Sequence, residues 1–201
     1  MTSIIITPET ENIIDIFNNA NNDDIFKIES GTYNFKKNLQ ITKSIKLVGD
    51  CKNKPVFMFK KNYSDSIEIT GNCNVTIENL IINSYSCCIW SNNIGTLKVS
   101  NCELNSEYND HAIEIIKQCN AYFNQCKIEG NVNISTGLTR HSSTITFDTC
   151  NIIGSIIAYF INITLINNTI KEDVSFLDCT YLIQNTQING KINYDDSIEA
   201  N

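Results

Sequence analysis

An eight-residue pattern that recurs six times constrains the fold of this chain more than any other feature. Its copies begin roughly 18 to 24 residues apart, a spacing typical of repeat architectures, at Val75, Leu97, Ala121, Ile145, Ile163 and Tyr181. They read V-T-I-E-N-L-I-I, L-K-V-S-N-C-E-L, A-Y-F-N-Q-C-K-I, I-T-F-D-T-C-N-I, I-T-L-I-N-N-T-I and Y-L-I-Q-N-T-Q-I. Mostly apolar residues at positions 1, 3 and 8, with a polar residue at position 5, predict a short strand, a corner and the start of a second strand.

A unit of this size cannot bury its own apolar face, whereas stacked copies can, so repetition near this period indicates a solenoid. Coils of roughly 18 to 24 residues, without a Gly-rich nonapeptide or a hexapeptide period, favour an all-β, three-faced parallel β-helix. We expect about seven or eight coils, stacked ~4.8 Å apart into a rod on the order of 35 Å long.

Composition narrows the classes of partner and the compartment. The net charge is −7, and the only basic cluster is the short stretch from Lys52 to Lys61, which disfavours a nucleic-acid partner and an anionic membrane surface. No signal peptide or transmembrane segment is recognisable, so we expect a cytoplasmic protein or part of an intracellular particle. The bias toward Ile, Asn and Lys suits an AT-rich genome, such as that of a large DNA virus or a protist.

Two columns of the repeat indicate structural fillers. Position 5 holds mostly amide side chains, which tolerate left-handed backbone at a bend and can bond along a column. These residues are Asn79, Asn101, Gln125, Thr149, Asn167 and Asn185. Position 6 holds Cys102, Cys126 and Cys150, and a second column holds Cys73, Cys119 and Cys179. Thiols in a straight column cannot surround a metal tetrahedrally and are too far apart for disulfides, so we expect buried free thiols, no metal and no cofactor.

An amphipathic helix is predicted over residues 8–20. Thr7 is suited to the N-cap and Pro8 to the first helical position, and the acids Glu9 and Glu11 would face the positive end of the helix dipole. An apolar stripe of Ile13, Ile14, Ile16 and Phe17 follows.

The sequence resembles the right-handed parallel β-helix, or pectin-lyase-like, superfamily over nearly its whole length and most clearly at its N-terminal end. The resemblance lies in D-I-F-K-I-E-S-G-T-Y-N-F from Asp24, L-Q-I-T-K-S-I-K-L-V-G-D from Leu39 and the later N-C-x-Φ corners. It implies that the helix at 8–20 caps the coils. Because no linker or low-complexity block divides the chain, we expect one domain of residues 1–201, with coils over 25–194 and an acidic tail at 195–201. The superfamily includes lyases, hydrolases, tailspikes, adhesins and non-catalytic binding modules, so the resemblance does not define an activity.

Motifs of the enzymes in this superfamily are missing. The chain has no N-T-D, G-H-G or R-x-K segment. The alternative catalytic set, next to Asp110, is His111, Glu114, Lys117, Arg140 and His141, which registration one coil apart would bring together as acid, base and cation. A surface salt-bridge cluster explains these residues equally well.

Aromatic residues near the predicted loops indicate a binding surface. The candidates are Tyr85, Trp90, Tyr108 and Tyr122, since sugar rings stack on such side chains. For Trp90, which follows Cys87-Cys88-Ile89, packing into the core is the favoured interpretation. The sequence thus predicts a non-enzymatic module that binds a glycan or a protein, or assembles with copies of itself. A divergent carbohydrate-active lyase or hydrolase is the alternative.

Overall fold

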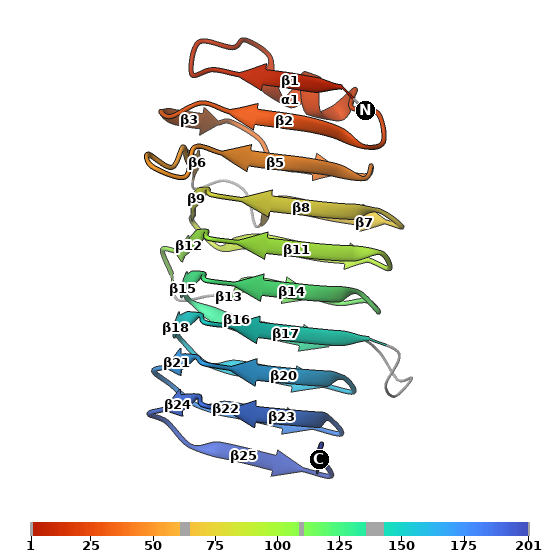
Figure 1. The fold of residues 1–201 in the computed structure, drawn as a ribbon, viewed down its shortest axis with the longest axis vertical. Coiled ribbons are helices and arrows are strands. Elements are labelled where there is room, and N and C mark those ends of the chain that lie inside the picture. Colours follow the sequence, from red (N-terminus) through yellow and green to blue (C-terminus); the bar gives the residue numbers. More distant parts are fainter. Residues whose placement is uncertain (1, 61–64, 109–110, 136–142, 201) are drawn as a thin grey trace.

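The chain winds into a parallel β-solenoid built from three sheets (Figure 1). A computed structural model describes residues 2–60, 65–108, 111–135 and 143–200. Each complete coil contributes one strand to each sheet, and every pairing in the described residues is parallel. The sheets contain ten, eight and eight strands, which corresponds to a solenoid of about eight turns. The predicted all-β class and number of coils are therefore confirmed.

The three sheets are named A, B and C here. Sheet A contains β1 (Ser3–Ile6), β2 (Asp24–Ile28), β5 (Ile45–Gly49), β8 (Asn74–Glu78), β11 (Thr96–Ser100), β14 (Asn120–Asn124), β17 (Thr144–Asp148), β20 (Asn162–Ile166), β23 (Thr180–Gln184) and β26 (Ile198–Glu199). Sheet B contains β3 (Thr32–Phe35), β6 (Val56–Phe59), β9 (Ile81–Ser84), β12 (Glu103–Ser106), β15 (Lys127–Glu129), β18 (Asn151–Ile153), β21 (Thr169–Ile170) and β24 (Gln187–Ile188). Sheet C contains β4 (Leu39–Ile41), β7 (Asp65–Gly71), β10 (Cys87–Asn93), β13 (His111–Ile115), β16 (Asn131–Ser135), β19 (Ile156–Tyr159), β22 (Val174–Leu177) and β25 (Ile192–Asp195).

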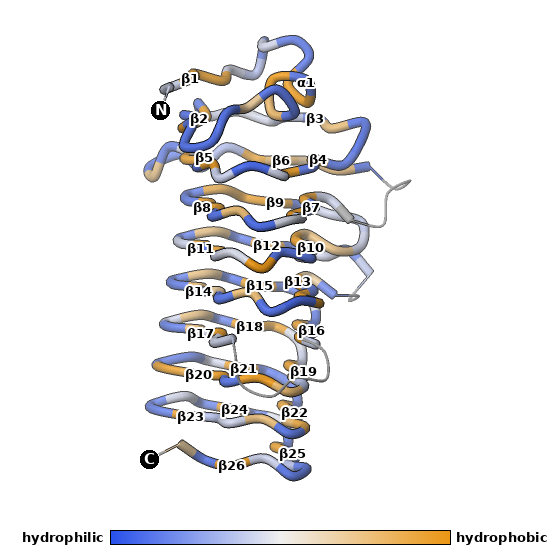
Figure 2. The backbone as a smooth tube through the Cα atoms, turned by 90° about the vertical axis from the view of Figure 1, so that its right-hand side faces the viewer, coloured by the Kyte–Doolittle hydropathy of each residue, from blue (hydrophilic) through white to orange (hydrophobic). Residues whose placement is uncertain are grey.

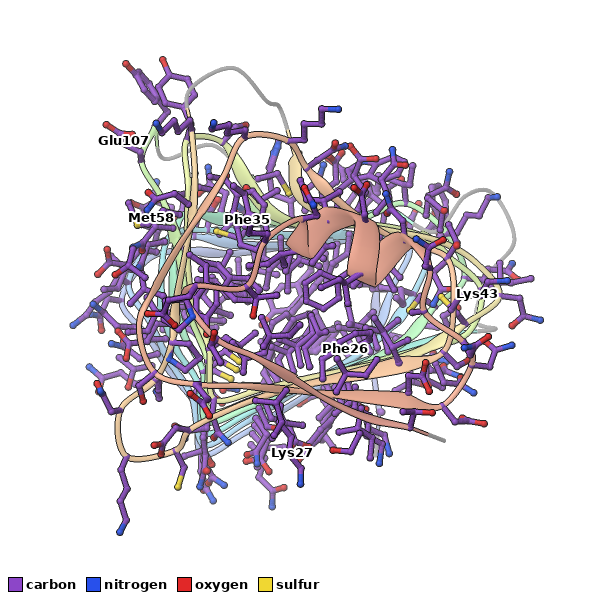
Figure 3. All side chains as sticks on the ribbon, turned by 90° about the horizontal axis from the view of Figure 1, so that it is seen from above. Phe26, Lys27, Phe35, Lys43, Met58 and Glu107 are labelled. Carbon is purple, nitrogen blue, oxygen red and sulfur yellow. The ribbon has the colours of Figure 1, made fainter. Side chains whose placement is uncertain are left out.

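The core lies inside the coils, because alternate side chains of each strand point inward. Apolar and polar residues alternate along the stacked turns in Figure 2. Seen along the axis, Phe26 and Phe35 point into the interior while Lys27 and Lys43 point outward (Figure 3). Aromatic rings also stack between coils, as in Phe123 and Phe147, whose centroids are 4.8 Å apart.

The repeated pattern forms a strand of sheet A, a corner and a strand of sheet B. All six residues at position 5 have left-handed backbone, with φ between 49° and 59°. The prediction from the amide column is therefore confirmed. Asn101 also donates its side-chain amide to Oδ1 of Asn79 at 2.8 Å, and Asn79 donates to the carbonyl of Gly49 at 3.2 Å.

The cysteines of both columns are buried and free, as predicted. Sγ of Cys102, Cys126 and Cys150 lies 3.5–3.6 Å from a backbone carbonyl in the preceding coil. Asn168 continues this column and donates to the carbonyl of Phe147 at 2.9 Å. The thiols therefore fill a buried corner beside the backbone of the preceding coil.

The N-terminal helix is much shorter than predicted. α1 spans only Ile13–Asn18, and its N-cap residue Asn12 has left-handed backbone and no side-chain capping bond. Thr7 and Pro8 instead belong to a turn that is closed by a hydrogen bond from the Thr10 N–H to the Thr7 carbonyl. The turn forms here because β1 ends at Ile6 and the chain must reverse its direction. Of the stripe, only Phe17 is fully buried; its ring lies 4.6 Å from that of Phe26. The role of α1 as a cap stays a prediction.

Asp24 fastens the N-terminal strand to the first coil. Its carboxylate accepts hydrogen bonds from the backbone N–H groups of Asn21 and Thr2, both at 2.9 Å. These hydrogen bonds hold the pKa of Asp24 below its usual value, and the bond from Asn21 contributes most. At the other end, stacking continues beyond residue 194, because β26 pairs with β23. Within the described ranges, no helix is long and apolar enough to cross a bilayer.

Candidate functional site

The outer face of sheet C carries the most distinctive group of polar and aromatic side chains. Glu68 of β7, Trp90 of β10 and Glu114 of β13 are direct partners in the strand register. Their strand neighbours are buried: Ile67, Ile69, Ile89, Ser91, Ile113 and Ile115. Alternation therefore directs all three side chains outward. The register continues to Gln40 before Glu68 and to Asn133 after Glu114. We name this row of five residues the Trp90 column.

The favoured interpretation of Trp90 as a core residue is wrong. Its side chain is half-buried on the outer face and is not part of the buried core. The misleading signal was the apolar run Cys87-Cys88-Ile89. Cys87, Cys88 and Ile89, the first three residues of β10, are all buried, and the thiol of Cys88 lies 3.6 Å from the carbonyl of Ile82. Inward and outward alternation begins only at Ile89, which places Trp90 outside.

Glu68 is held in place by two amide side chains. Asn38 donates to one carboxylate oxygen, and Gln40 donates to the other at 3.2 Å. A carboxylate has about four acceptor sites, so both oxygens keep lone pairs for a ligand. Asn38, Gln40 and Glu68 were not predicted as site residues. The alternating segment Ile67-Glu68-Ile69 precedes Ile89-Trp90-Ser91 by the same offset that separates the first two repeat copies, and this offset could have revealed the alignment.

Two predicted binding residues, Tyr85 and Tyr108, contact each other at the corner between sheets B and C. Their ring centroids are 4.3 Å apart at an interplanar angle of 53°, and Tyr108 is 59% exposed. Contact with Tyr85 raises the pKa of Tyr108. This corner is next to Glu107, which points outward in Figure 3. Tyr85 precedes β10 and Tyr108 precedes β13, so the pair belongs to the coils that carry Trp90 and Glu114.

Tyr122 is on a different surface. It lies on the outer face of sheet A, where its hydroxyl donates to Oδ2 of Asp148 at 3.1 Å. Burial, followed by this contact with Asp148, raises the pKa of Tyr122. The four aromatic candidates therefore do not form a single platform: three belong to sheet C and its edge, and the fourth does not.

The alternative catalytic set is only partly described. His111 opens β13, Glu114 lies within it, and Lys117 follows it as an exposed residue. Within this described segment, no hydrogen bond or ion pair joins Glu114 to Lys117. Arg140 and His141, like Asp110, lie outside the described residues. Among the residues that are described, no three His, Cys, Asp or Glu side chains gather as a metal site.

The register used to group that set differs between sheets. In sheet A, Ala121 pairs with Ile145, which lies one repeat later, as the sequence predicts. In sheet C, Glu114 pairs with Asn133, an offset shorter than that from Ala121 to Ile145. The additional residues of the coil fall in the connection between β16 and β17, which contains Arg140 and His141. An alignment by the repeat length of sheet A therefore does not determine where these two residues lie relative to Lys117.

Comparisons with known proteins support the fold. No family model matches the chain, and no curated protein matches it. The solved structures that match include a PL6 family alginate lyase, AlyGC, and a mutant of that enzyme. Each has a TM-score of 0.54 and 11% sequence identity, and each match covers all of this chain but only 40% of the enzyme chain. At this level of identity, the likeness shows a shared parallel β-helix fold and nothing more specific.

Proposed function

We propose that this chain is a non-enzymatic β-helix module that binds an extended glycan on the outer face of sheet C. The observation that carries the proposal is the outward, half-buried indole of Trp90, aligned between Glu68 and Glu114. An indole offers a flat apolar surface to a sugar ring, and the neighbouring carboxylates and amides accept hydrogen bonds from sugar hydroxyls. As part of this proposal, the solenoid winds right-handed, as in the superfamily that it resembles, and the protein is located inside the cell.

The tyrosine pair extends this surface along the strand direction. Tyr85 is five residues before Trp90, so the chain between them spans at most ~17 Å at about 3.3 Å per residue. A ligand lying across the strands of two coils could therefore contact Trp90 in the middle of the sheet and Tyr108 at its edge. A rod with a flat face suits a long polymer better than a small molecule, which needs a concave site.

Truncation of the indole tests this function. In calorimetric titrations with a panel of neutral, acidic and amino-sugar oligosaccharides, Trp90→Ala should weaken binding of any ligand at least about tenfold, as expected for a central aromatic contact. Tyr122→Ala removes an exposed aromatic ring from the outer face of sheet A and should leave the affinity unchanged. Equal losses in both variants, or no effect of Trp90→Ala on a measurable affinity, would refute the assignment of the site.

A carbohydrate-active lyase is the second candidate, and the fold shared with an alginate lyase favours it. It would use His111, Glu114 and Lys117, together with Arg140 and His141. Incubation with alginate and other acidic polysaccharides, followed by absorbance of unsaturated uronate ends, distinguishes the two functions. The binding-module proposal expects no product. Product formation by the unaltered chain that disappears in a folded His141→Ala variant would establish the enzyme instead.

A further inference from the structure

We propose that the glycan bound by sheet C carries ammonium groups, as polymers of amino sugars do; this inference rests on the proposed function. The observation is the order of side chains along the Trp90 column, where an indole lies between two carboxylates in consecutive coils. Trp is the strongest aromatic partner for a cation, which it attracts when the cation lies within ~6 Å of the ring centroid.

The spacing of the coils allows one ammonium group to be attracted by all three side chains. Adjacent strands lie about 4.8 Å apart, so the backbones of Glu68 and Glu114 each lie one strand spacing from that of Trp90. A cation above the indole would also be within reach of both carboxylates. Glu68 is already oriented by Asn38 and Gln40, so its binding would require little further ordering of that side chain.

The distribution of charge favours a cationic ligand over a polyuronate. The described lysines around this face lie in the segments that enter or leave sheet C, at Lys36, Lys37, Lys43, Lys60, Lys117, Lys171 and Lys191, the last two in coils beyond the Trp90 column. The middle of the face contains Glu68 and Glu114 and no described lysine or arginine. A uronate carboxylate stacked on Trp90 would lie close to two like charges, on a chain of net charge −7.

The inference is tested with three probes of equal length: glucosamine oligomers, fully N-acetylated glucosamine oligomers and alginate oligomers. At low ionic strength, the glucosamine oligomers should bind more tightly than the other two. Each of Glu68→Gln and Glu114→Gln should weaken this binding about two- to fivefold, the range for a solvent-exposed ion pair. The double variant should weaken it more than either single variant but not by their simple product, because both carboxylates attract the same ammonium group. Added salt should reduce the preference, because the charges are exposed.

Glu78→Gln is the matched control, since it removes a carboxylate from the outer face of sheet A. It should leave the affinity unchanged. If Glu78→Gln weakens binding as much as Glu114→Gln, the polycation is attracted only by net charge and the inference is wrong. It is also wrong if N-acetylated oligomers bind equally well in a Trp90-dependent manner, although the glycan-binding function would then stand. If none of the three probes binds, the inference is wrong, and the glycan-binding function is then decided by the wider oligosaccharide panel and its dependence on Trp90.

Discussion

Thr149 occupies a corner position for which its side chain is poorly suited, so Thr149→Asn should stabilise the protein. Thr149 is β-branched and has φ 56°, in the same left-handed column as Asn79, Asn101 and Gln125. Left-handed backbone costs an L-residue ~1–2 kcal/mol, and Asn is among the residues that bear it best. The substitution loses the exposed hydrogen bond from Oγ1 of Thr149 to Asp148, at 2.9 Å, which offsets a few tenths of a kcal/mol.

The expected net gain is about 1 kcal/mol in the free energy of unfolding, or a rise in Tm of about 2–4 °C for a chain of this size. Urea unfolding followed by circular dichroism gives the midpoint and the slope, and an unchanged slope is required to convert the shift into stability. Thr146→Asn makes the same chemical change in the extended strand β17 and is the control. A gain of equal size in Thr146→Asn, or no gain in Thr149→Asn, would refute the argument from backbone conformation.

Three further predictions concern the ends and the thiols. Phe17→Ala should destabilise the N-terminal coil by about 3 kcal/mol, because the ring is buried against Phe26; hydrogen exchange should then accelerate in β1 and β2 before the central coils. The lowered pKa of Asp24 stabilises the fold above the unfolded-state pKa, and this contribution is lost as the pH falls through the folded-state pKa. The free energy of unfolding, measured from neutral pH to about pH 2, should therefore fall less in Asp24→Asn than in the unaltered protein. Only Cys51 is exposed among the nine cysteines, so a thiol reagent should label one group quickly, and Cys51→Ser should abolish this fast phase.

The coil architecture could be predicted because its determinants repeat. Alternation of apolar residues gives the strands, Asn and Gln at position 5 give the left-handed corners, and small thiols at position 6 fill the space beside them. Each feature is a local preference that agrees with the stacked structure, and six copies make a chance agreement improbable. The cysteine column is a clear example, since Cys102, Cys126 and Cys150 occupy equivalent positions and contact equivalent carbonyls.

The N-terminal segment was less predictable because its structure depends on tertiary contacts rather than on local signals. Thr7, Pro8 and the two following acids form a good helix start by propensity, yet they lie in the turn that follows β1. Pairing of β1 with β2 and the anchoring of this strand by Asp24 satisfy backbone groups at the first coil. Between β1 and β2, only the six residues of α1 are helical.

Trp90 and Glu114 were predicted separately as site residues but were not aligned with Glu68 on sheet C, for a reason that also bears on the proposed role of these residues. Inward positions are constrained by packing, so their residues follow from the repeat, whereas outward positions are free to vary. The spacings from Glu68 to Trp90 and from Trp90 to Glu114 equal those between the first three repeat copies, so the alignment of these residues follows from the coil lengths. Their chemical identity does not follow from them. No requirement of the coil places an indole between two carboxylates on a solvated face, so a ligand is the better physical explanation for that combination.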